Sequence, residues 1–273
     1  KYSGMLVILI LSGPKYFQRR QTIRNTWLSG LPTEVLWYFA LGTKDLSPEE
    51  IETLEYENSN SGDVLLLKNV NDSYGKLTFK ISESFKWVDK NINYKYLLKA
   101  DDDTYARVDN ILSELKKREN MEPLYWGFFD GRAKVKTAGL WAESQWHLCD
   151  TYLPHARGGG YVLSSELVTY ISRNSKLLQL YNSEDVSVGA WLGPLKITRV
   201  HDSRFDTEYK SRGCNNKYII THKQDIQAMK EKHKNLKTIG KLCKKEIQTR
   251  PSYEYNWNVP PSQCCQRTDI SVP

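Results

Sequence analysis

Residues 96–103 (YLLKADDD) join a short apolar run to three consecutive aspartates, and this stretch sets the expectation for the fold. The run at 96–100 is typical of a buried strand. Similar runs occur at 5–11 (MLVILIL), 35–41 (VLWYFAL), 64–67 (VLLL) and 124–129 (LYWGFF). Helical patterns separate them, and such alternation predicts a parallel, doubly wound α/β sheet. Ligands in that architecture bind beyond the carboxyl ends of the strands, which is where the aspartates follow.

The helices are expected where apolar residues recur every three or four positions or where a polar segment begins with proline. We expect them at 20–27, from Pro48 onwards, at 77–88, at 111–115, near 164–174, near 184–192 and at 225–236. The second half is less regular. There we expect a turn at 158–160 (GGG), a strand at 217–221 and a Cys/Pro-rich tail that begins near Lys241.

The composition is that of a globular protein. The 273 residues carry 39 Lys and Arg against 32 Asp and Glu, a formal charge of +7, and 40% of them are apolar. These values exclude a disordered or fibrous chain. The longest apolar run, 5–11, is far shorter than the roughly 20 residues of a membrane-spanning helix. The positive charge suits an anionic ligand, but no block of five like charges marks a nucleic-acid-binding arm.

The five cysteines indicate an oxidising compartment. Four of them lie in the last third of the chain among turns, and none has the spacing of a zinc site, which favours disulfide bonds. Two bridges and one free cysteine are expected, with the pairing left open. Asn71-Asp72-Ser73 is an N-glycosylation acceptor if the chain is secreted. We therefore expect the lumen of the secretory pathway.

The triple aspartate predicts a divalent cation. Asp101, Asp102 and Asp103 repel one another, and carboxylate oxygens suit Mg²⁺ or Mn²⁺, which in turn bridge phosphates. The alternative is a solvated acidic loop in which one aspartate caps the next helix. His222 follows the apolar run at 218–221 and would complete a mixed Asp/His site, or simply end a strand.

Glycine-rich phosphate loops are missing from the sequence. GxxxxGK[ST], GxGxxG after the first strand and HExxH are all absent, which argues against P-loop kinases, Rossmann dehydrogenases and common zinc proteases. Phosphate charge would then be neutralised by the cation and by Arg19, Arg20, Arg24 and Lys80. The alternative for these residues is a solvated helix face.

Glu184 and Asp185 open a predicted helix. Acidic residues in a first turn satisfy free N–H groups without any catalytic role. A carboxylate held there also suits a general base for a hydroxyl nucleophile. The second interpretation gains weight beside the aspartates and beside 158–160, where missing side chains let a ligand approach the backbone.

Together these pieces resemble the β-1,3-glycosyltransferase family, which contains β-1,3-galactosyltransferases, β-1,3-N-acetylglucosaminyltransferases and the fringes. The matching blocks occur in family order at 19–27 (RRQTIRNTW), 72–81 (DSYGKLTFKI), 97–105 (LLKADDDTY), 158–164 (GGGYVLS), 184–189 (EDVSVG) and 220–223 (ITHK). The resemblance covers about residues 5–236. It implies a GT-A fold, a Rossmann-like mixed sheet flanked by helices. It also implies one lumenal catalytic domain over 1–273, with a nucleotide-binding half at about 1–105, an acceptor-binding half at about 106–240 and the tail at 241–273.

The resemblance also implies residue roles. Asp101 and Asp102 would contact the uridine and ribose side of a UDP-galactose donor. Asp103 with His222 would hold Mn²⁺ on the pyrophosphate. Asp185 would be the base of an inverting transfer, with Glu184 orienting an acceptor hydroxyl. Arg20, Arg24 and Lys80 would line the donor pocket.

Three stretches point to a subfamily: 127–153, 191–216 and 260–267 (PPSQCCQR) are most similar to members that act on the proteoglycan linker. This implies transfer onto the 3-hydroxyl of the galactose in Galβ1-4Xyl-O-Ser of a proteoglycan core protein. Family members are type II membrane proteins of the Golgi, so the chain is expected to be a lumenal part that lacks its signal anchor. The alternatives are a β-1,3-N-acetylglucosaminyltransferase, a metal-dependent UDP-sugar hydrolase and a non-enzymatic carbohydrate-binding module.

Overall fold

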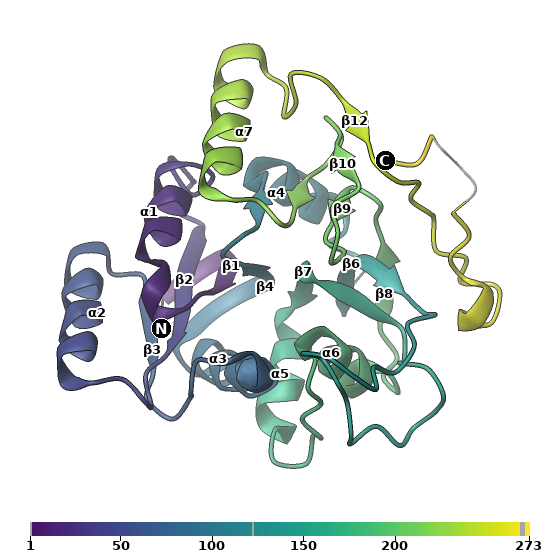
Figure 1. Ribbon diagram of the computed structural model, residues 1–273, viewed down its shortest axis with the longest axis horizontal. Helices are drawn as coiled ribbons and strands as arrows, with labels where there is room; N and C mark the ends of the chain where they lie inside the picture. The colour runs from purple at the N-terminus through teal and green to yellow at the C-terminus, as the bar shows by residue number, and fades with distance from the viewer. Residues whose placement is uncertain (1, 122, 268–270) are drawn as a thin grey trace.

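A computed structural model describes residues 2–121, 123–267 and 271–273 (Figure 1). Its centre is a seven-stranded sheet with the strand order β3-β2-β1-β4-β7-β6-β8. The strands of this sheet are β1 (Tyr2–Leu11), β2 (Val35–Gly42), β3 (Val64–Leu67), β4 (Ile92–Asp101), β6 (Leu124–Asp130), β7 (His155–Ser164) and β8 (Thr198–His201). The sheet therefore contains strands from both of the halves expected from the sequence.

The first four strands pair in parallel, as their alternation with helices predicts. The expectation of a parallel sheet is wrong beyond β4, where β7, a strand that the sequence did not predict, runs antiparallel to both β4 and β6. Parallel neighbours need a crossover connection, whereas the segment between β6 and β7 contains no helix and brings the chain back beside β6. The result is a mixed sheet flanked by helices, which confirms the expected GT-A-type fold class.

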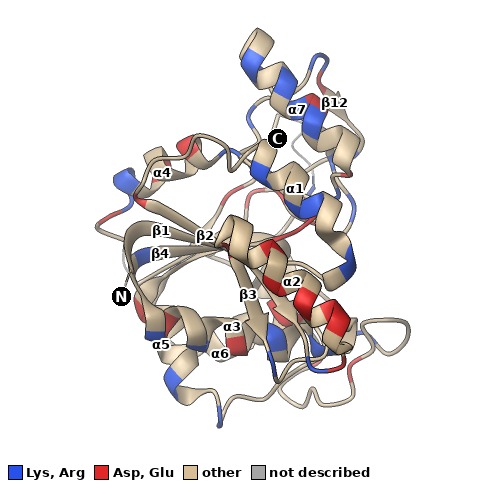
Figure 2. Cartoon of the chain, turned by 90° about the vertical axis from the view of Figure 1, so that its left-hand side faces the viewer, with Lys and Arg blue, Asp and Glu red and all other residues tan. Residues whose placement is uncertain are grey.

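The helices cover both faces of this sheet. Figures 1 and 2 show α3, α5 and α6 on one face and α1, α4 and α7 on the other, with α2 at the β3 edge. Figure 2 also shows acidic residues along α2 and basic residues along α1 and α7. The helices are α1 (Phe17–Asn25), α2 (Pro48–Ser61), α3 (Leu77–Asn91), α4 (Val108–Lys117), α5 (Ser165–Asn174), α6 (Glu184–Leu192) and α7 (Ile226–Ile239). All the predicted helices are present, and their bounds differ from the expected ones by a few residues.

The core lies on both faces of β1. Leu6, Val7, Ile8, Leu9 and Ile10 are all fully buried. A strand covered by helices on both sides has no polar face, which explains the continuous apolar run. Each such side chain contributes roughly 1.5–3 kcal/mol through its burial. This core holds the carboxyl end of β1 in place next to that of β4, its parallel neighbour.

Gly158–Gly160 was expected to form a turn, and this expectation is wrong. The three glycines lie inside β7, where Gly160 is paired with Ala100 of β4 and the register with β6 shifts between Ala156 and Tyr161. The structure gives the reason: a Cβ on Gly159 would lie 2.6 Å from the His222 ring, and one on Gly158 would lie 3.3 Å from Asp185 Oδ2. The missing side chains let His222 and Asp185 pack directly against the β7 backbone, and the chain does not change direction there.

A small sheet joins the middle of the chain to its last third. It consists of β5 (Tyr105–Ala106), β9 (Phe205–Asp206) and β11 (Ile220–Thr221), with β11 in the centre. The strand expected at 217–221 is thus confined to its last two residues. β11 is antiparallel to β5, and Thr221 is paired with Tyr105. Because the two strands are antiparallel, His222, which follows Thr221, lies next to Asp103, which precedes Tyr105.

The tail is held to the rest of the chain by one disulfide bond and by packing of Tyr253 and Tyr255 against the β6 residues Phe128 and Phe129. Cys214 is bonded to Cys243 and Cys264 to Cys265, while Cys149 is free and exposed, so the expected two bridges and one free cysteine are confirmed. The first bridge lies beside a ribbon of β10 (Gly213–Cys214) and β12 (Ile247–Gln248). Among the described residues, no helix combines the length and the apolar character that crossing a membrane requires.

Candidate active site

The three aspartates point in two directions, Asp102 to one set of partners and Asp101 and Asp103 to another. β4 ends at Asp101, and Thr104 N–H donates to the Asp101 carbonyl, which turns the chain sharply. Asp102 receives hydrogen bonds from Ser12 Oγ at 2.8 Å and from Arg19 at 2.9 Å. Asp101 and Asp103 instead face His222. Their mutual repulsion is therefore offset by Arg19 and His222, which are far away in the sequence, and by Lys99, which binds Asp101 at 2.8 Å.

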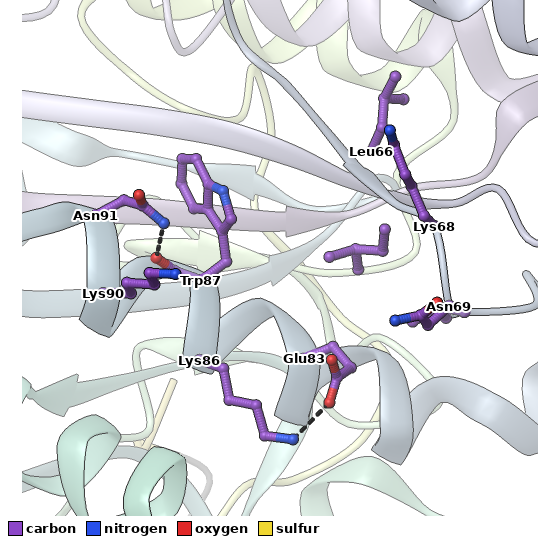
Figure 3. A pocket seen from close by; sticks show the side chains of 10 residues that line it. Leu66, Lys68, Asn69, Glu83, Lys86, Trp87, Lys90 and Asn91 are labelled. Atoms are coloured by element: carbon purple, nitrogen blue, oxygen red, sulfur yellow. Dashed lines mark hydrogen bonds and ion pairs between the residues drawn. The ribbon is translucent and has the colours of Figure 1, made fainter.

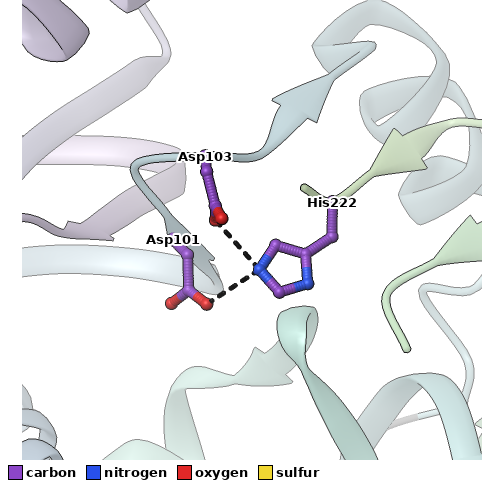
Figure 4. Close-up of side chains that lie close together, drawn as sticks. All are labelled: Asp101, Asp103 and His222. Carbon is purple, nitrogen blue, oxygen red and sulfur yellow. Dashed lines mark ion pairs between the residues drawn. The ribbon is translucent and has the colours of Figure 1, made fainter. Parts of the chain in front are cut away.

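Asp101, Asp103 and His222 form a cluster with the geometry of a cation site (Figure 4). His222 Nε2 lies 2.9 Å from Asp103 Oδ1 and 3.3 Å from Asp101 Oδ2, and the candidate ligand atoms all lie within 4.8 Å of one another. His222 Nε2 is nevertheless buried without an aligned hydrogen bond. Its other ring nitrogen, Nδ1, is 3.4 Å from the Glu208 carbonyl oxygen, a contact that orients the ring and leaves Nε2 to the carboxylates.

The pKa values in the cluster reflect its charge. Burial alone would lower the pKa of His222, but the two carboxylates raise it to about 9. Burial would raise the pKa of Asp101, yet the positive charges of Lys99 and His222 hold it well below its usual range. Asp103 follows the same pattern through His222. The cluster thus attracts a proton to the position where two carboxylate oxygens and one imidazole nitrogen would hold a metal ion.

The β7 glycines bring a second group of carboxylates close to this cluster. Gly159 lies against the His222 ring, and its carbonyl accepts a 2.6 Å hydrogen bond from Thr104 Oγ1. One residue earlier, Gly158 N–H donates to Asp185 Oδ2 at 2.9 Å. The Gly158–Gly160 backbone therefore separates the cation cluster from the start of α6 by a single strand.

Glu184 and Asp185 have different environments at the start of α6. Glu184 is buried, with one oxygen bound to Lys99 at 3.0 Å and the other to the Tyr161 hydroxyl. Burial raises its pKa to about 7. Asp185 is partly exposed and accepts bonds from Gly158 N–H and from Val186 N–H at 2.9 Å each. Asp185 therefore satisfies a free N–H at the helix start and also has access to solvent. A capping role and a role as general base are thus compatible for this residue.

The basic residues that were expected in the donor pocket have acidic protein partners. Arg20 is fully buried and bound to Glu57, and Arg24 binds Glu57 and Asp63. None of the hydrogen bonds or ion pairs of the described residues joins either arginine to Asp101, Asp103 or His222. Arg19 instead reaches the aspartates through Asp102 and remains one-third exposed.

Lys80 reaches the backbone just beyond β1, where Arg20 also donates to the Gly13 carbonyl at 2.6 Å. It is buried, and its ammonium group donates to the Ser12 carbonyl beyond β1 and to Asp72 Oδ1 at 2.7 Å. Burial lowers its pKa, against the attraction of Asp72, Asp102 and Asp101.

Lys99 and Tyr161 are the important residues that the sequence analysis missed. Lys99 connects Asp101 to Glu184, and Tyr161 holds the second oxygen of Glu184. The signal for Lys99 was a single lysine inside the apolar run of a buried strand, because lysine is rarely buried without a charged partner. Tyr161 carries no comparable signal.

A cavity of about 420 Å³ lies elsewhere, between the turn after β3 and α3 (Figure 3). Lys68, Lys86, Lys90 and Glu83 supply its charged groups, and Lys86 is paired with Glu83. All four side chains are exposed or partly exposed. The cavity therefore has none of the buried, perturbed groups that distinguish the cluster at β4.

The arrangement at β4 and β7 suits group transfer from a phosphate-bearing donor to a hydroxyl acceptor. A cation site at a strand end is combined with a partly exposed carboxylate one strand away. Residues 18–203 match the galactosyltransferase family, and the chain belongs to that family.

Individual relatives agree with this assignment. The chain is 50% identical to mouse beta-1,3-galactosyltransferase 6 over 97% of its own length and 84% of the relative's. It is 32% identical to UDP-GalNAc:beta-1,3-N-acetylgalactosaminyltransferase 2 of Xenopus laevis, over 59% of this chain and 33% of that one. It is 30% identical to hydroxyproline O-galactosyltransferase GALT5 of Arabidopsis thaliana, over 82% of this chain and 34% of that one. The chain thus spans most of the mouse relative but only about a third of the other two.

Proposed function

We propose that this chain is an inverting β-1,3-galactosyltransferase with UDP-galactose as its donor. We further propose the galactose of Galβ1-4Xyl-O-Ser as the acceptor, which is the reaction of galactosyltransferase II in proteoglycan linker synthesis. The observation that carries the proposal is the placement of the Asp101, Asp103 and His222 cluster and of Asp185 on the two sides of Gly158–Gly160. The 50% identity to a mouse β-1,3-galactosyltransferase supports the donor and the linkage.

The cluster fits a divalent cation, which we propose to be Mn²⁺. Two carboxylates and one imidazole form a donor set that suits this metal, and the buried His222 Nε2 lacks an aligned partner among the described residues. When bound, the cation would act as a Lewis acid that stabilises the charge on the UDP leaving group. Asp103 and His222 are its proposed ligands. The Asp101 carboxylate belongs to the same cluster, with Oδ2 3.3 Å from His222 Nε2.

The chain's own residues account for the other half of the transfer. Inversion at the anomeric carbon requires a single displacement, with a base on the face opposite the leaving group. Asp185 is the proposed base: its Oδ2 is fixed by Gly158 N–H and its side chain is partly exposed, so an acceptor hydroxyl can reach it. Base catalysis of this kind supplies about 10²–10⁴-fold in rate. Arg19, which is bound to Asp102 and one-third exposed, is available to a donor phosphate.

A donor screen with defined acceptors tests this proposal. Radiolabelled UDP-galactose, UDP-GlcNAc and UDP-GalNAc are each incubated with a Galβ1-4Xyl glycoside, with Mn²⁺ present or chelated. We expect labelled trisaccharide from UDP-galactose alone, and only with Mn²⁺. Product from UDP-GlcNAc would instead support the N-acetylglucosaminyltransferase alternative.

The same reactions without acceptor test for hydrolysis. A UDP-sugar hydrolase would release free galactose at the same rate whether or not the disaccharide is present. A transferase excludes water from the donor until the acceptor is bound. Binding of the disaccharide without any turnover would favour a carbohydrate-binding module.

We propose that the protein works in the Golgi lumen. The two disulfide bonds support an oxidising compartment, and the side chain of Asn71 lies at the surface, where an oligosaccharide can be attached. Immunofluorescence with a Golgi marker tests the location. A mobility shift after glycosidase treatment, lost in Asn71→Gln, tests the glycosylation.

A further inference from the structure

The most completely bonded charge in the site is Lys99. Its side chain is 2% exposed although it carries an ammonium group. The three N–H donors have three acceptors: Asp101 Oδ1 at 2.8 Å, the Gly158 carbonyl at 2.5 Å and Glu184 Oε2 at 3.0 Å. An ammonium group has three donors, so none is left for a substrate.

These three acceptors belong to the two halves of the candidate site. Asp101 belongs to the cation cluster, and Glu184 begins the helix that carries Asp185. Gly158 connects them a second time, because its carbonyl binds Lys99 while its N–H binds Asp185. Lys99 therefore contacts Asp101 and Glu184 directly, and it is connected to Asp185 through the Gly158 peptide.

We propose that Lys99 is a positioning residue that fixes the acceptor-side carboxylates relative to the cation cluster. This inference rests on the proposed function. Lys99 aligns Asp185 through the Gly158 peptide and Glu184 through a direct ion pair. Its positive charge also offsets part of the negative charge of Asp101, which limits how strongly the cluster attracts a cation. Tyr161 completes the arrangement by binding the other Glu184 oxygen and lying 5.8 Å from the Lys99 ammonium.

The variant Lys99→Met tests this role, since methionine keeps most of the apolar chain and removes the charge. We expect kcat for transfer to fall by about 10–100-fold, as is typical when a supporting partner is lost. Mn²⁺ should bind at least roughly threefold more tightly, because a positive charge beside Asp101 is gone. A purely structural role predicts the opposite for Mn²⁺, since a distorted site binds it more weakly.

A second variant guards against misfolding. Lys99→Met/Glu184→Gln removes one charge of each sign, so no extra unpaired carboxylate is buried. We expect this protein to fold and its Mn²⁺ affinity, measured by calorimetry, to return close to that of the unchanged protein. Lys95→Met is the matched control, because Lys95 lies on the same strand but is exposed and paired with the exposed Glu119. It should change neither kcat nor Mn²⁺ binding.

Hydrogen exchange separates this inference from the proposed function, since it needs neither metal nor turnover. In Lys99→Met we expect faster exchange of the amides at 157–160, with β1 unaffected. Unchanged exchange there, or Mn²⁺ affinity that falls together with kcat, would overturn the role of Lys99. Absence of Mn²⁺ binding by the unchanged protein would overturn the proposed cation, while altered exchange would still support the alignment of Gly158.

Discussion

Two groups of charged side chains on either side of Ser12 differ in how their charges are balanced. Between α1 and α2, Arg20 and Arg24 meet Glu57 and Asp63, two cations for two carboxylates, with ion-pair distances of 2.6–2.8 Å. Around the end of β4, Lys99 binds the carboxylates of Asp101 and Glu184. The third carboxylate, Asp103, contacts His222 at 2.9 Å and the exposed Lys223 at 3.4 Å.

The difference shows how residues of the same type acquire different roles. The α1–α2 group balances its charges within the protein, as a buried structural network must, although Arg24 Nη1 has no hydrogen-bond partner among the described residues. The β4 group has more negative than fixed positive charge and keeps an unaligned nitrogen, His222 Nε2, between two carboxylates. An excess of charge of this kind marks a site for an external cation. The predictions below test this contrast in order of their expected effect on transfer.

Asp185→Asn should have the largest effect. Loss of the base should lower kcat by about 10²–10⁴-fold, while Mn²⁺ and UDP binding, measured by calorimetry, stay unchanged because Asp185 does not belong to the cation cluster. Asp109→Asn, an exposed acid in the first turn of α4, is the control and should keep full activity. Full activity of Asp185→Asn would refute the assignment of the base.

Asp103→Ala should abolish the Mn²⁺ dependence of UDP binding. The variant removes one of two carboxylates that contact His222, so Mn²⁺ affinity should fall by at least about 100-fold, more than the loss of a supporting residue. Calorimetric titration with UDP, with and without Mn²⁺, measures this change. Asp109→Ala serves as control, and unaltered Mn²⁺ affinity in Asp103→Ala would remove this residue from the proposed ligands.

The pH dependence of Mn²⁺ binding should follow His222. A metal needs the neutral imidazole, and the pKa of His222 is raised to about 9, so apparent affinity should rise by about tenfold per pH unit between pH 6.5 and 9. The metal-free protein should behave in the opposite way. Its protonated His222 stabilises the fold fully below pH 6.5, and this stability is lost as the pH rises through 9.

Calorimetry and denaturant unfolding across this pH range measure the two trends. Both should be flattened in His222→Gln and retained in His147→Gln, since His147 is exposed and remote from the cluster in the sequence. A Mn²⁺ affinity that does not vary with pH would argue against His222 as a ligand.

Arg20→Met should have the smallest effect on transfer although it disturbs the fold most. Breaking a buried ion pair by removing one partner costs about 3–5 kcal/mol of stability, whereas the folded fraction should keep its KM and kcat within about a factor of two. Denaturant unfolding and steady-state kinetics measure the two quantities, with exposed Arg173→Met as control. A large rise in the KM for UDP-galactose would instead place Arg20 in the donor pocket and weaken the contrast.

The sequence predicted local structure well and long-range pairing poorly. β1 to β4 and all the helices were expected from apolar periodicity, which depends on neighbouring residues alone. β7 was not expected as a strand, so its antiparallel place between β4 and β6 was missed, because the irregular segment before it does not reveal on which side of β6 the chain returns. The glycines of β7 were taken for a turn, since their neighbour His222 is more than sixty residues away.

The candidate site shows the same division. Asp101, Asp103, Asp185 and His222 were chosen from strand ends and helix starts, and the structure brings them to one place. The pairing of β11 with β5 that joins His222 to Asp103 spans more than a hundred residues. Arg20 and Lys80 stand out equally in the sequence, and both donate to the backbone just beyond β1, but Arg20 is paired with Glu57 and Lys80 with Asp72.

The sequence by itself determined the fold class, the family and the set of charged residues near strand ends, because these follow from apolar periodicity and from short motifs. The tertiary structure alone decided which charges neutralise one another and which are left in excess. Electrostatic interaction depends on distance and burial, and a lysine such as Lys99 acquires its partners Asp101 and Glu184 only after β4, β7 and α6 have packed together.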